Sequence, residues 1–387
     1  MMGADRFIAR RIKFQGRLAS TAIAVSFLVI IIAIAVSAGF RREIQSGVAA
    51  LTGDIILATA PSAGIGEDGC MKVSESYMDR MAGMDGVTGL TPVIYRAGIV
   101  KAGSDIQGVM FKGIPSSDST LCVRIPSRLA SILNLGKGDA MVTYFIGEKV
   151  KVRKFTVSDI YDSILDSDDK LVVYAPIEDI RRLNEWEEDE VSSIEVTVAP
   201  GKRTRGGLRA MAMQMTAYSM DCATEDDDVP VATSSGDKYS QLFDWLDLID
   251  FNVVAVLLLM TIVAGFDMIS GLLILLFRHI STIGTLKALG MTDKGIASVF
   301  LRVSARTVLK GIVAGNAAAL LLCLVQGMTH LIKLNPENYF VSFVPVSVNP
   351  AVIVLADVVS FAAIMLLLLI PCIFISKIDP SETVKAE

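Results

Sequence analysis

The chain has 387 residues, of which 52% are hydrophobic, and its formal net charge is −5. Such a hydrophobic excess is typical of a membrane protein rather than of an ordinary soluble domain. The acidic balance argues against nucleic acid as the main partner, because phosphate binding requires a basic face. The apolar residues gather near residues 20–40 and again after residue 250, which predicts a membrane protein with a large polar insert.

The first apolar run, residues 18–40, carries no charge and reaches the roughly 20 residues that a spanning helix needs. It is too long for the apolar part of a signal peptide, which is about 7–15 residues, although Ser37-Ala38-Gly39 could mimic a cleavage site. We therefore interpret it as an uncleaved transmembrane helix. The amphipathic segment 1–17 before it is basic, with Arg6, Arg10, Arg11, Lys13 and Arg17.

Three further apolar runs predict transmembrane helices at 248–277, 303–328 and 350–375. The connection 278–302 is short. The connection and the start of the next run are basic, with Arg278, Lys287, Lys294, Arg302, Arg306 and Lys310. By the positive-inside rule, this connection and segment 1–17 are cytoplasmic. The tail 376–387 is then also cytoplasmic, while the domain 41–247 and the loop 329–349 lie in the periplasm of a bacterial inner-membrane protein.

Segment 41–247 predicts an α+β extracytoplasmic domain with two possible lobes. Alternating apolar residues predict strands at 54–59, 107–114, 140–146, 153–160, 170–174 and 193–198. Helical spacing predicts helices at 177–184, after Pro176, and at 206–216. The strands on either side of Gly147-Glu148 predict a hairpin.

The domain has no catalytic constellation. The two histidines of the chain, His279 and His330, both lie outside it, so a Ser/His/Asp or metal–histidine site is excluded there. Acid runs lack the spacing of a calcium loop, and we interpret them as solvated loops; they are 187–190, 225–228, Asp159, Asp162, Asp166, Asp168 and Asp169. No metal site and no cofactor is predicted.

The cysteines show no metal-ligand spacing. Cys323 and Cys372 lie in apolar runs, where cysteine behaves as a small hydrophobe. Cys70, Cys122 and Cys222 lie in the predicted outside domain, so at most one disulfide could form, and its connectivity stays open.

Segment 278–301 predicts a short amphipathic helix at the membrane face. Its apolar residues recur at a spacing of three, as Ile280, Ile283, Leu286 and Leu289. Gly290 is expected to end this helix, and Thr292-Asp293 to cap the next. Such a helix is either an anchored loop or the lever through which a cytoplasmic motor acts on the spans.

This segment resembles the FtsX/MacB-type ABC permease superfamily. The resemblance rests on Arg278, on Ile283-Gly284, on Leu286-Lys287-Ala288-Leu289-Gly290, and on Ile296 and Phe300-Leu301. Most relatives have glutamate where this chain has Thr282. The resemblance implies an ATPase-coupling loop formed by Arg278, Ile280, Thr282, Ile283, Gly284, Leu286, Lys287, Ala288, Leu289 and Gly290, and a MacB-like periplasmic core domain.

Other stretches resemble the lipoprotein-releasing (LolC/LolE) branch of Bacteroidetes-type bacteria. They are 7–12, 40–44, 144–146, 153–156, 169–171, 182–184 and 378–384. This branch implies an acylated lipoprotein as cargo, membrane lipids around the spans and a possible periplasmic carrier. Between Pro115 and Pro126 the chain looks shorter than its relatives.

The chain has no G-x-x-x-x-G-K-[S/T] sequence, so it is not expected to hydrolyse ATP itself. The resemblance implies a cytoplasmic ABC ATPase dimer and a second permease subunit, identical or homologous, as partners. A MacB-like efflux permease and an FtsX-like mechanotransmitter that controls a periplasmic partner remain alternatives. A membrane sensor without a motor is a third, disfavoured by the coupling loop.

Two polar residues interrupt the predicted spans. Asp267 lies well inside the second span, where an ionisable group is costly and marks either a function or an interface. Both a functional and a structural role stay open for it. Asn316 in the third span predicts a hydrogen bond between helices.

Overall fold

The structure is a computed structural model. It describes residues 17–59, 69–73, 75–103, 105–116, 119–147, 149–162, 171–222, 229–335, 339 and 341–373. Several sequence predictions lie outside these residues: most of segment 1–17, Glu148, Lys170, the acids at 166–169 and 225–228, the end of the fourth span, the tail 376–387, and the side chain of Cys222.

The chain divides into two compact units, each described here by itself. The membrane unit comprises residues 1–41, 246–332 and 344–387, and the α+β domain comprises residues 42–245 and 333–343. The helices of the membrane unit are α2 Arg17–Thr52, α8 Ser240–Arg278, α9 Ile280–Ala288, α10 Asp293–Thr329, α12 Pro350–Leu367 and α13 Leu369–Cys372. Helices α2 and α8 each continue into the domain.

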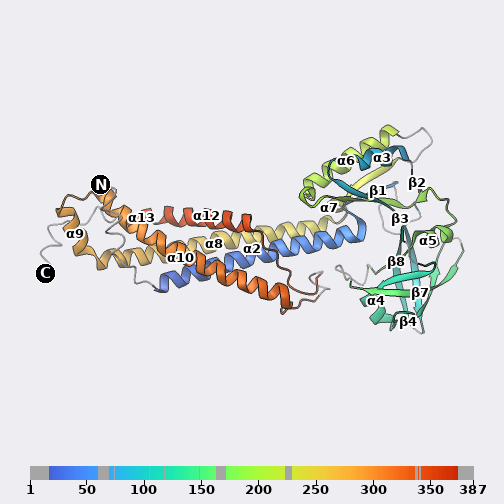
Figure 1. The fold of residues 1–387 in the computed structure, drawn as a ribbon, viewed down its shortest axis with the longest axis horizontal. Helices are drawn as coiled ribbons and strands as arrows, with labels where there is room; N and C mark the ends of the chain where they lie inside the picture. The colour runs from blue at the N-terminus through green and yellow to red at the C-terminus, as the bar shows by residue number, and fades with distance from the viewer. Residues whose placement is uncertain are drawn as a thin grey trace. The chain divides into compact units, whose positions relative to one another are not determined.

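Four helices of the described chain are long and apolar enough to cross a membrane, at Ala19–Thr52, Ser240–Arg278, Asp293–Thr329 and Pro350–Cys372 (Figure 1). Four predicted spans are therefore found. The first helix continues to Thr52 rather than ending near residue 40. Hydropathy marks where a span ends, whereas a helix continues through any polar residues that favour it.

Close packing of α10 on α2 depends on two glycines. A methyl group on Gly315 would lie 2.5 Å from the carbonyl oxygen of Ala24 and 2.9 Å from Cβ of Phe27. One on Gly311 would lie 2.6 Å from Cγ2 of Ile23. The side chains of Ile23 and Phe27 are completely buried. The two helix backbones approach this closely because no Cβ stands between them, as is common for helices in membranes.

The α+β domain has two lobes. Its strands are β1 Ile55–Thr59, β2 Met71–Lys72, β3 Val87–Ala102, β4 Asp105–Ile114, β5 Cys122–Pro126, β6 Ala140–Phe145, β7 Lys151–Tyr161, β8 Val172–Pro176, β9 Glu190–Val191, β10 Ser193–Val198 and β11 Pro230–Ser234. Its helices are α3 Glu75–Ala82, α4 Ser127–Leu133, α5 Ile177–Asn184, a 3-10 turn Pro200–Lys202, α6 Arg205–Cys222 and α7 Ser235–Lys238.

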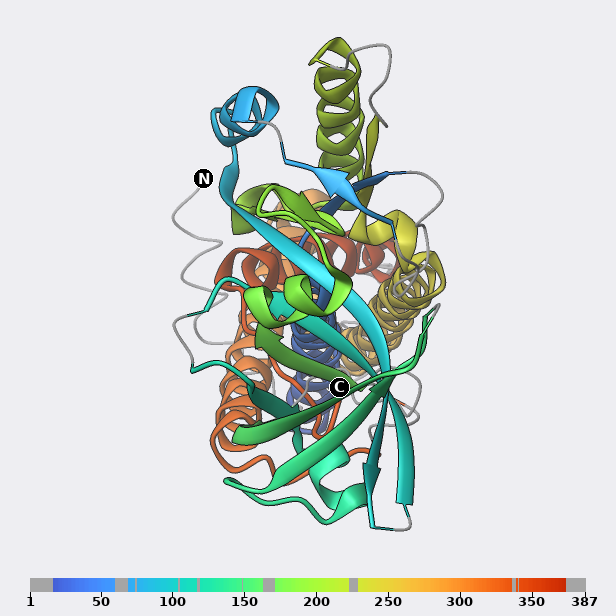
Figure 2. The same ribbon diagram turned by 90° about the vertical axis from the view of Figure 1, so that its right-hand side faces the viewer.

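Strand β3 belongs to both lobes. The sheet order is β11-β1-β10-β3-β4-β8-β5-β7-β6, and β3 also pairs with β6. The first half of β3 pairs with β10, and the second half pairs with β4 and β6. Strands β3, β4, β8, β5, β7 and β6 therefore close into a barrel, while β11, β1, β10 and the start of β3 form a sheet that packs against α6 and α3. Figure 2 shows β3 running through the domain as its longest strand.

Three phenylalanines fill the barrel. The ring of Phe111 lies 5.0 Å from that of Phe145 and 5.2 Å from that of Phe155. All three side chains are buried. A Cβ atom on Gly98 of β3 would lie 3.0 Å from both Phe145 and Thr143, so the absence of a side chain there leaves room for the aromatic core.

The predicted strands and helices of the domain are found, with boundaries shifted by a few residues, and β6 and β7 form the predicted hairpin. Two acids were wrongly assigned to loops. Asp159 lies within β7 and pairs with Lys137, and Glu190 lies in β9. Cys70 and Cys122 are free thiols, so they do not form a disulfide with each other.

We predict that Gly315→Ala loosens the α10–α2 contact, because its methyl group has no space. Overpacking of this kind costs about 1–3 kcal/mol, and the melting temperature of the detergent-solubilised protein should fall accordingly. Gly327→Ala on the same helix is the matched control, since its Cβ would meet only Cγ2 of Val346, at 3.5 Å. Equal melting temperatures for the two variants would contradict the packing argument.

Candidate functional site

The connection between α8 and α10 contains the predicted coupling helix. Helix α9 follows His279 and ends in a hydrogen-bonded turn. The amide of Met291 donates to the carbonyl of Leu286 at 3.0 Å, and the amide of Gly290 donates to that of Lys287 at 2.9 Å. Gly290 has φ +87°, the left-handed conformation that this kind of helix end favours. The prediction that Gly290 ends the helix is confirmed.

The next helix is capped as predicted. The hydroxyl of Thr292 accepts a hydrogen bond from the amide of Gly295 at 3.3 Å. The ammonium of Lys287 lies 2.9 Å from a carboxylate oxygen of Asp293, in the first turn of α10. This ion pair joins the end of α9 to the first turn of α10.

Helix α9 presents one buried and one exposed face. Ile283 and Gly284 are buried, Leu286 is half-buried, and Ile283 packs in the same cluster as Leu276 and Phe300. The exposed predicted residues are Arg278, Ile280, Thr282, Ala288, Leu289 and Gly290. The side chain of Leu289 is 79% exposed. Residues spaced by three do not stay on one face of a helix that has 3.6 residues per turn. The four apolar residues therefore do not form one buried stripe.

Polar contacts also join the spanning helices. The amide nitrogen of Asn316 donates to a carboxylate oxygen of Asp357 at 2.6 Å, and the hydroxyls of Thr261 and Ser360 lie 3.0 Å apart. The hydrogen bond predicted for Asn316 between helices is thus present. Asp267 is half-buried and makes no hydrogen bond or ion pair with a described residue. Asp357 was missed, although it stands in an apolar run as visibly as Asp267.

A charged cluster joins α2 to α8. The guanidinium of Arg41 lies 2.6 Å from an oxygen of Asp247 and 2.5 Å from one of Asp250. Asp250 also accepts a hydrogen bond from the hydroxyl of Ser37. The sequence offers no signal for this pairing, because the partners are more than two hundred residues apart along the chain.

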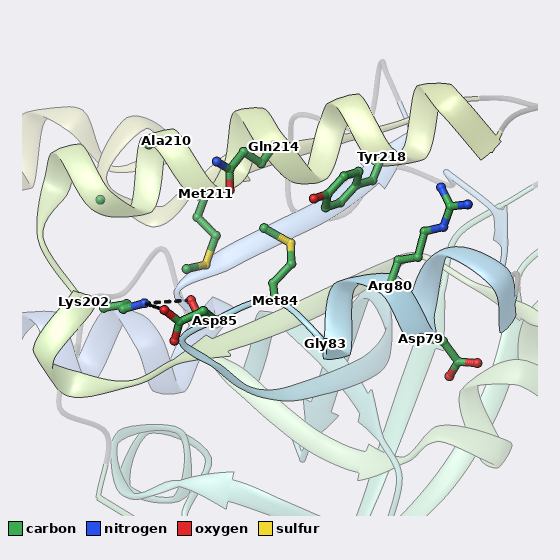
Figure 3. A pocket seen from close by; sticks show the side chains of 11 residues that line it. Asp79, Arg80, Gly83, Met84, Asp85, Lys202, Ala210, Met211, Gln214 and Tyr218 are labelled. Atoms are coloured by element: carbon green, nitrogen blue, oxygen red, sulfur yellow. Dashed lines mark hydrogen bonds and ion pairs between the residues drawn. The ribbon is translucent and has the colours of Figure 1, made fainter.

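The α+β domain has a groove of about 790 Å³ between α3 and α6. Figure 3 shows Met84 and Met211 in its wall, with the ion pair of Lys202 and Asp85 at one end. The residues that line it are Asp79, Arg80, Gly83, Met84, Asp85, Lys202, Gly207, Ala210, Met211, Gln214 and Tyr218. They include no serine, cysteine or histidine, so the residues that line the groove form no Ser–His or Cys–His pair.

Sequence comparison relates the C-terminal part of the chain to a protein family, and nearly the whole chain to a bacterial membrane protein. Residues 254–380 match the family described as FtsX-like permease C-terminal. The lipoprotein-releasing system transmembrane protein LolC of Neisseria meningitidis serogroup B is 22% identical over 404 residues, covering 94% of this chain and 92% of that protein.

Two solved structures are similar to part of the chain. The extracellular domain of the noncanonic ABC-type transporter YknZ from Gram-positive bacteria covers 46% of this chain and 99% of its own, at 11% identity and a TM-score of 0.30. The periplasmic region of MacB from Actinobacillus actinomycetemcomitans covers 52% of this chain and 95% of its own, at 13% identity and a TM-score of 0.32.

Four long apolar helices, with an α+β domain between the first and the second along the chain, are the architecture of a protein that spans a membrane. The chain is thus similar to FtsX-like permeases in its C-terminal third and to LolC over nearly its whole length.

We predict that Arg41→Met weakens the α2–α8 contact, because it removes the guanidinium that Asp247 and Asp250 share. The loss should be about 1 kcal/mol, the upper end of the range for exposed ion pairs, because the side chains of Asp247 and Asp250 are 51% and 43% exposed; it is measured as a lower melting temperature in detergent. Arg42→Met is the matched control, because Arg42 is exposed and makes no such contact with the described residues. If Arg41→Met melts like Arg42→Met, the cluster does not hold these helices together.

Proposed function

We propose that this chain is the permease subunit of a transporter that extracts lipoproteins from the inner membrane, with ATP hydrolysed by a separate cytoplasmic ATPase dimer. The observation that carries the proposal is the similarity to LolC, which extends over 94% of the chain and so includes the outside domain as well as the spans. A second permease subunit, identical or homologous, completes the membrane part.

The orientation follows from charge. The cations at 278–310 favour a cytoplasmic location for α9, and the α+β domain then faces the periplasm. Helix α9 lies between two spanning helices and is fixed to the second by the Lys287–Asp293 ion pair. A motor that contacts the exposed Leu289 and Ile280 would therefore move α10 together with α9.

The cargo is an acylated protein. The lipid chains of such a cargo are apolar, and each buried methylene contributes about 0.8 kcal/mol of transfer free energy. The spanning helices expose many large apolar side chains that an acyl chain or a lipid can contact; examples are Phe251, Phe266, Val313 and Leu355. A periplasmic carrier is the expected acceptor once the cargo has left the membrane.

The first test is co-purification of the chain with a candidate ATPase, followed by ATPase assays with and without triacylated lipoprotein. We predict that Leu289→Asp lowers the amount of co-purified ATPase at least about tenfold, which corresponds to roughly 1.4 kcal/mol, because a carboxylate would be desolvated at the contact. The chain itself should fold normally, since Leu289 has little packing to lose.

Leu331→Asp is the matched control, because Leu331 is also strongly exposed, at 76%, and follows the opposite end of α10. Equal loss of ATPase in both variants would contradict the assignment of α9 as the motor contact. A complex whose turnover does not respond to lipoprotein would contradict the cargo and favour efflux or mechanotransmission. If the chain forms no complex with the ATPase, the result would favour a membrane sensor without a motor.

A further inference from the structure

The last turn of helix α2 ends on a buried polar cluster of the α+β domain, formed by Lys112, Glu195 and Tyr95. The ammonium of Lys112 donates to the carbonyl of Leu51 at 2.8 Å and to that of Ala50 at 3.4 Å, and it pairs with Glu195 at 2.8 Å. Only 3% of the Lys112 side chain and 9% of the Glu195 side chain are exposed. We call these three residues the helix-end cluster.

The cluster is tied into four strands. Tyr95 of β3 lies opposite Lys112 of β4, which lies opposite Tyr174 of β8. Glu195 stands on β10 and accepts a hydrogen bond from the hydroxyl of Tyr95. The Lys112 ammonium lies 5.9 Å from the centre of the Tyr95 ring and 5.8 Å from that of Tyr174. The end of α2 is thereby bonded to strands from both lobes.

The electrostatics favour a cation at this position. The carbonyls of the last helical turn carry partial negative charge and have no partners within the helix. Burial lowers the pKa of Lys112 and raises the pKa of Glu195, while their mutual attraction opposes both shifts. A buried ion pair seldom stabilises a fold more than a well-packed apolar pair would. An apolar pair could not donate the hydrogen bonds that Lys112 makes to the carbonyls of Leu51 and Ala50.

The covalent link beyond α2 is short and begins with a potential hinge. Helix α2 ends at Thr52, and only Gly53 and Asp54 separate it from β1. Gly53 has φ +71°, a backbone conformation that glycine adopts without strain. Asp54 is held by the amide of Val198 at 2.7 Å and by Arg203 at 3.0 Å. Without the cluster, Gly53 would be free to absorb movement of the helix end.

We propose that Lys112 is the positioning residue that fixes the end of the first spanning helix to the sheet, so that displacement of α2 reaches β3, β4 and β8. The inference rests on the proposed function, in which a motor moves the spans. It concerns the transmission of that movement and not the identity of the cargo.

The test uses the full chain in complex with its ATPase, reconstituted in lipid nanodiscs, and compares amide hydrogen exchange with and without ATP. In the wild type, ATP should change exchange both in residues 42–52 and in residues 105–114. In the double variant Lys112→Met with Glu195→Gln, which leaves no unpaired buried charge, the change in 42–52 should persist. The change in 105–114 should fall at least threefold, and lipoprotein release per ATP should fall with it.

A charge-swapped variant, Lys112→Glu with Glu195→Lys, separates coupling from folding. It restores an ion pair but turns a carboxylate toward the carbonyls of α2, so transmission should stay lost while the melting temperature recovers. If either double variant unfolds, Tyr95→Phe removes the hydroxyl that contacts Leu51 (3.3 Å) and donates to Glu195, without removing a charge. It should reduce the ATP-dependent change in 105–114 about twofold.

The proposal would be overturned if ATP changed exchange in residues 105–114 as much in Lys112→Met with Glu195→Gln as in the wild type. If the double variants unfold, the same result in Tyr95→Phe would overturn it. So would a wild-type complex in which ATP changes exchange in neither segment. A wild-type complex that transmits the ATP-dependent change but ignores lipoprotein would contradict the proposed cargo alone and leave the role of Lys112 supported.

Discussion

The packing of helix α2 against its neighbours is the contact on which the membrane unit depends. Ile23, Phe27 and Ile31 of α2 are completely buried, although a spanning helix at the edge of a bundle would expose such residues to lipid. Ile23 and Phe27 are buried because Gly311 and Gly315 let α10 approach the α2 backbone, and Ile31 lies in a cluster with Ala319 and Ile353. In lipid there is little hydrophobic drive to bring helices together, so close van der Waals contact of this kind supplies the association. The most buried of the four spanning helices is thus one of the two that continue into the α+β domain.

Polar groups also join the helices of the membrane unit. Asn316 with Asp357, and Thr261 with Ser360, join helices at points where an unpaired polar group would be costly. Arg41 with its two carboxylates does so for α2 and α8. Asp267 differs, because it has no such contact with the described residues.

Local patterns in the sequence predicted local structure well. The four spans follow from uninterrupted apolar runs, and Gly290 and Thr292 mark helix ends because their chemistry acts within one turn. The hairpin of β6 and β7 and the helix at 177–184 were likewise predicted. Strand β3 was missed, since Gly89, Pro92 and Gly98 interrupt its pattern. The pairing of Lys112 with Glu195 could not be predicted, because it depends on strands far apart in the chain and on the closure of the barrel.

The order of the strands has a consequence for how the domain folds. All six barrel strands lie between Val87 and Pro176, so the barrel can close as soon as that segment has been synthesised. Strand β1 precedes them but pairs only with β10 and β11, which end at Ser234. The sheet next to α2 must therefore wait for the last part of the domain, and bringing such distant strands together is slow. During synthesis, the first spanning helix is followed by an unpaired strand until the domain is almost complete.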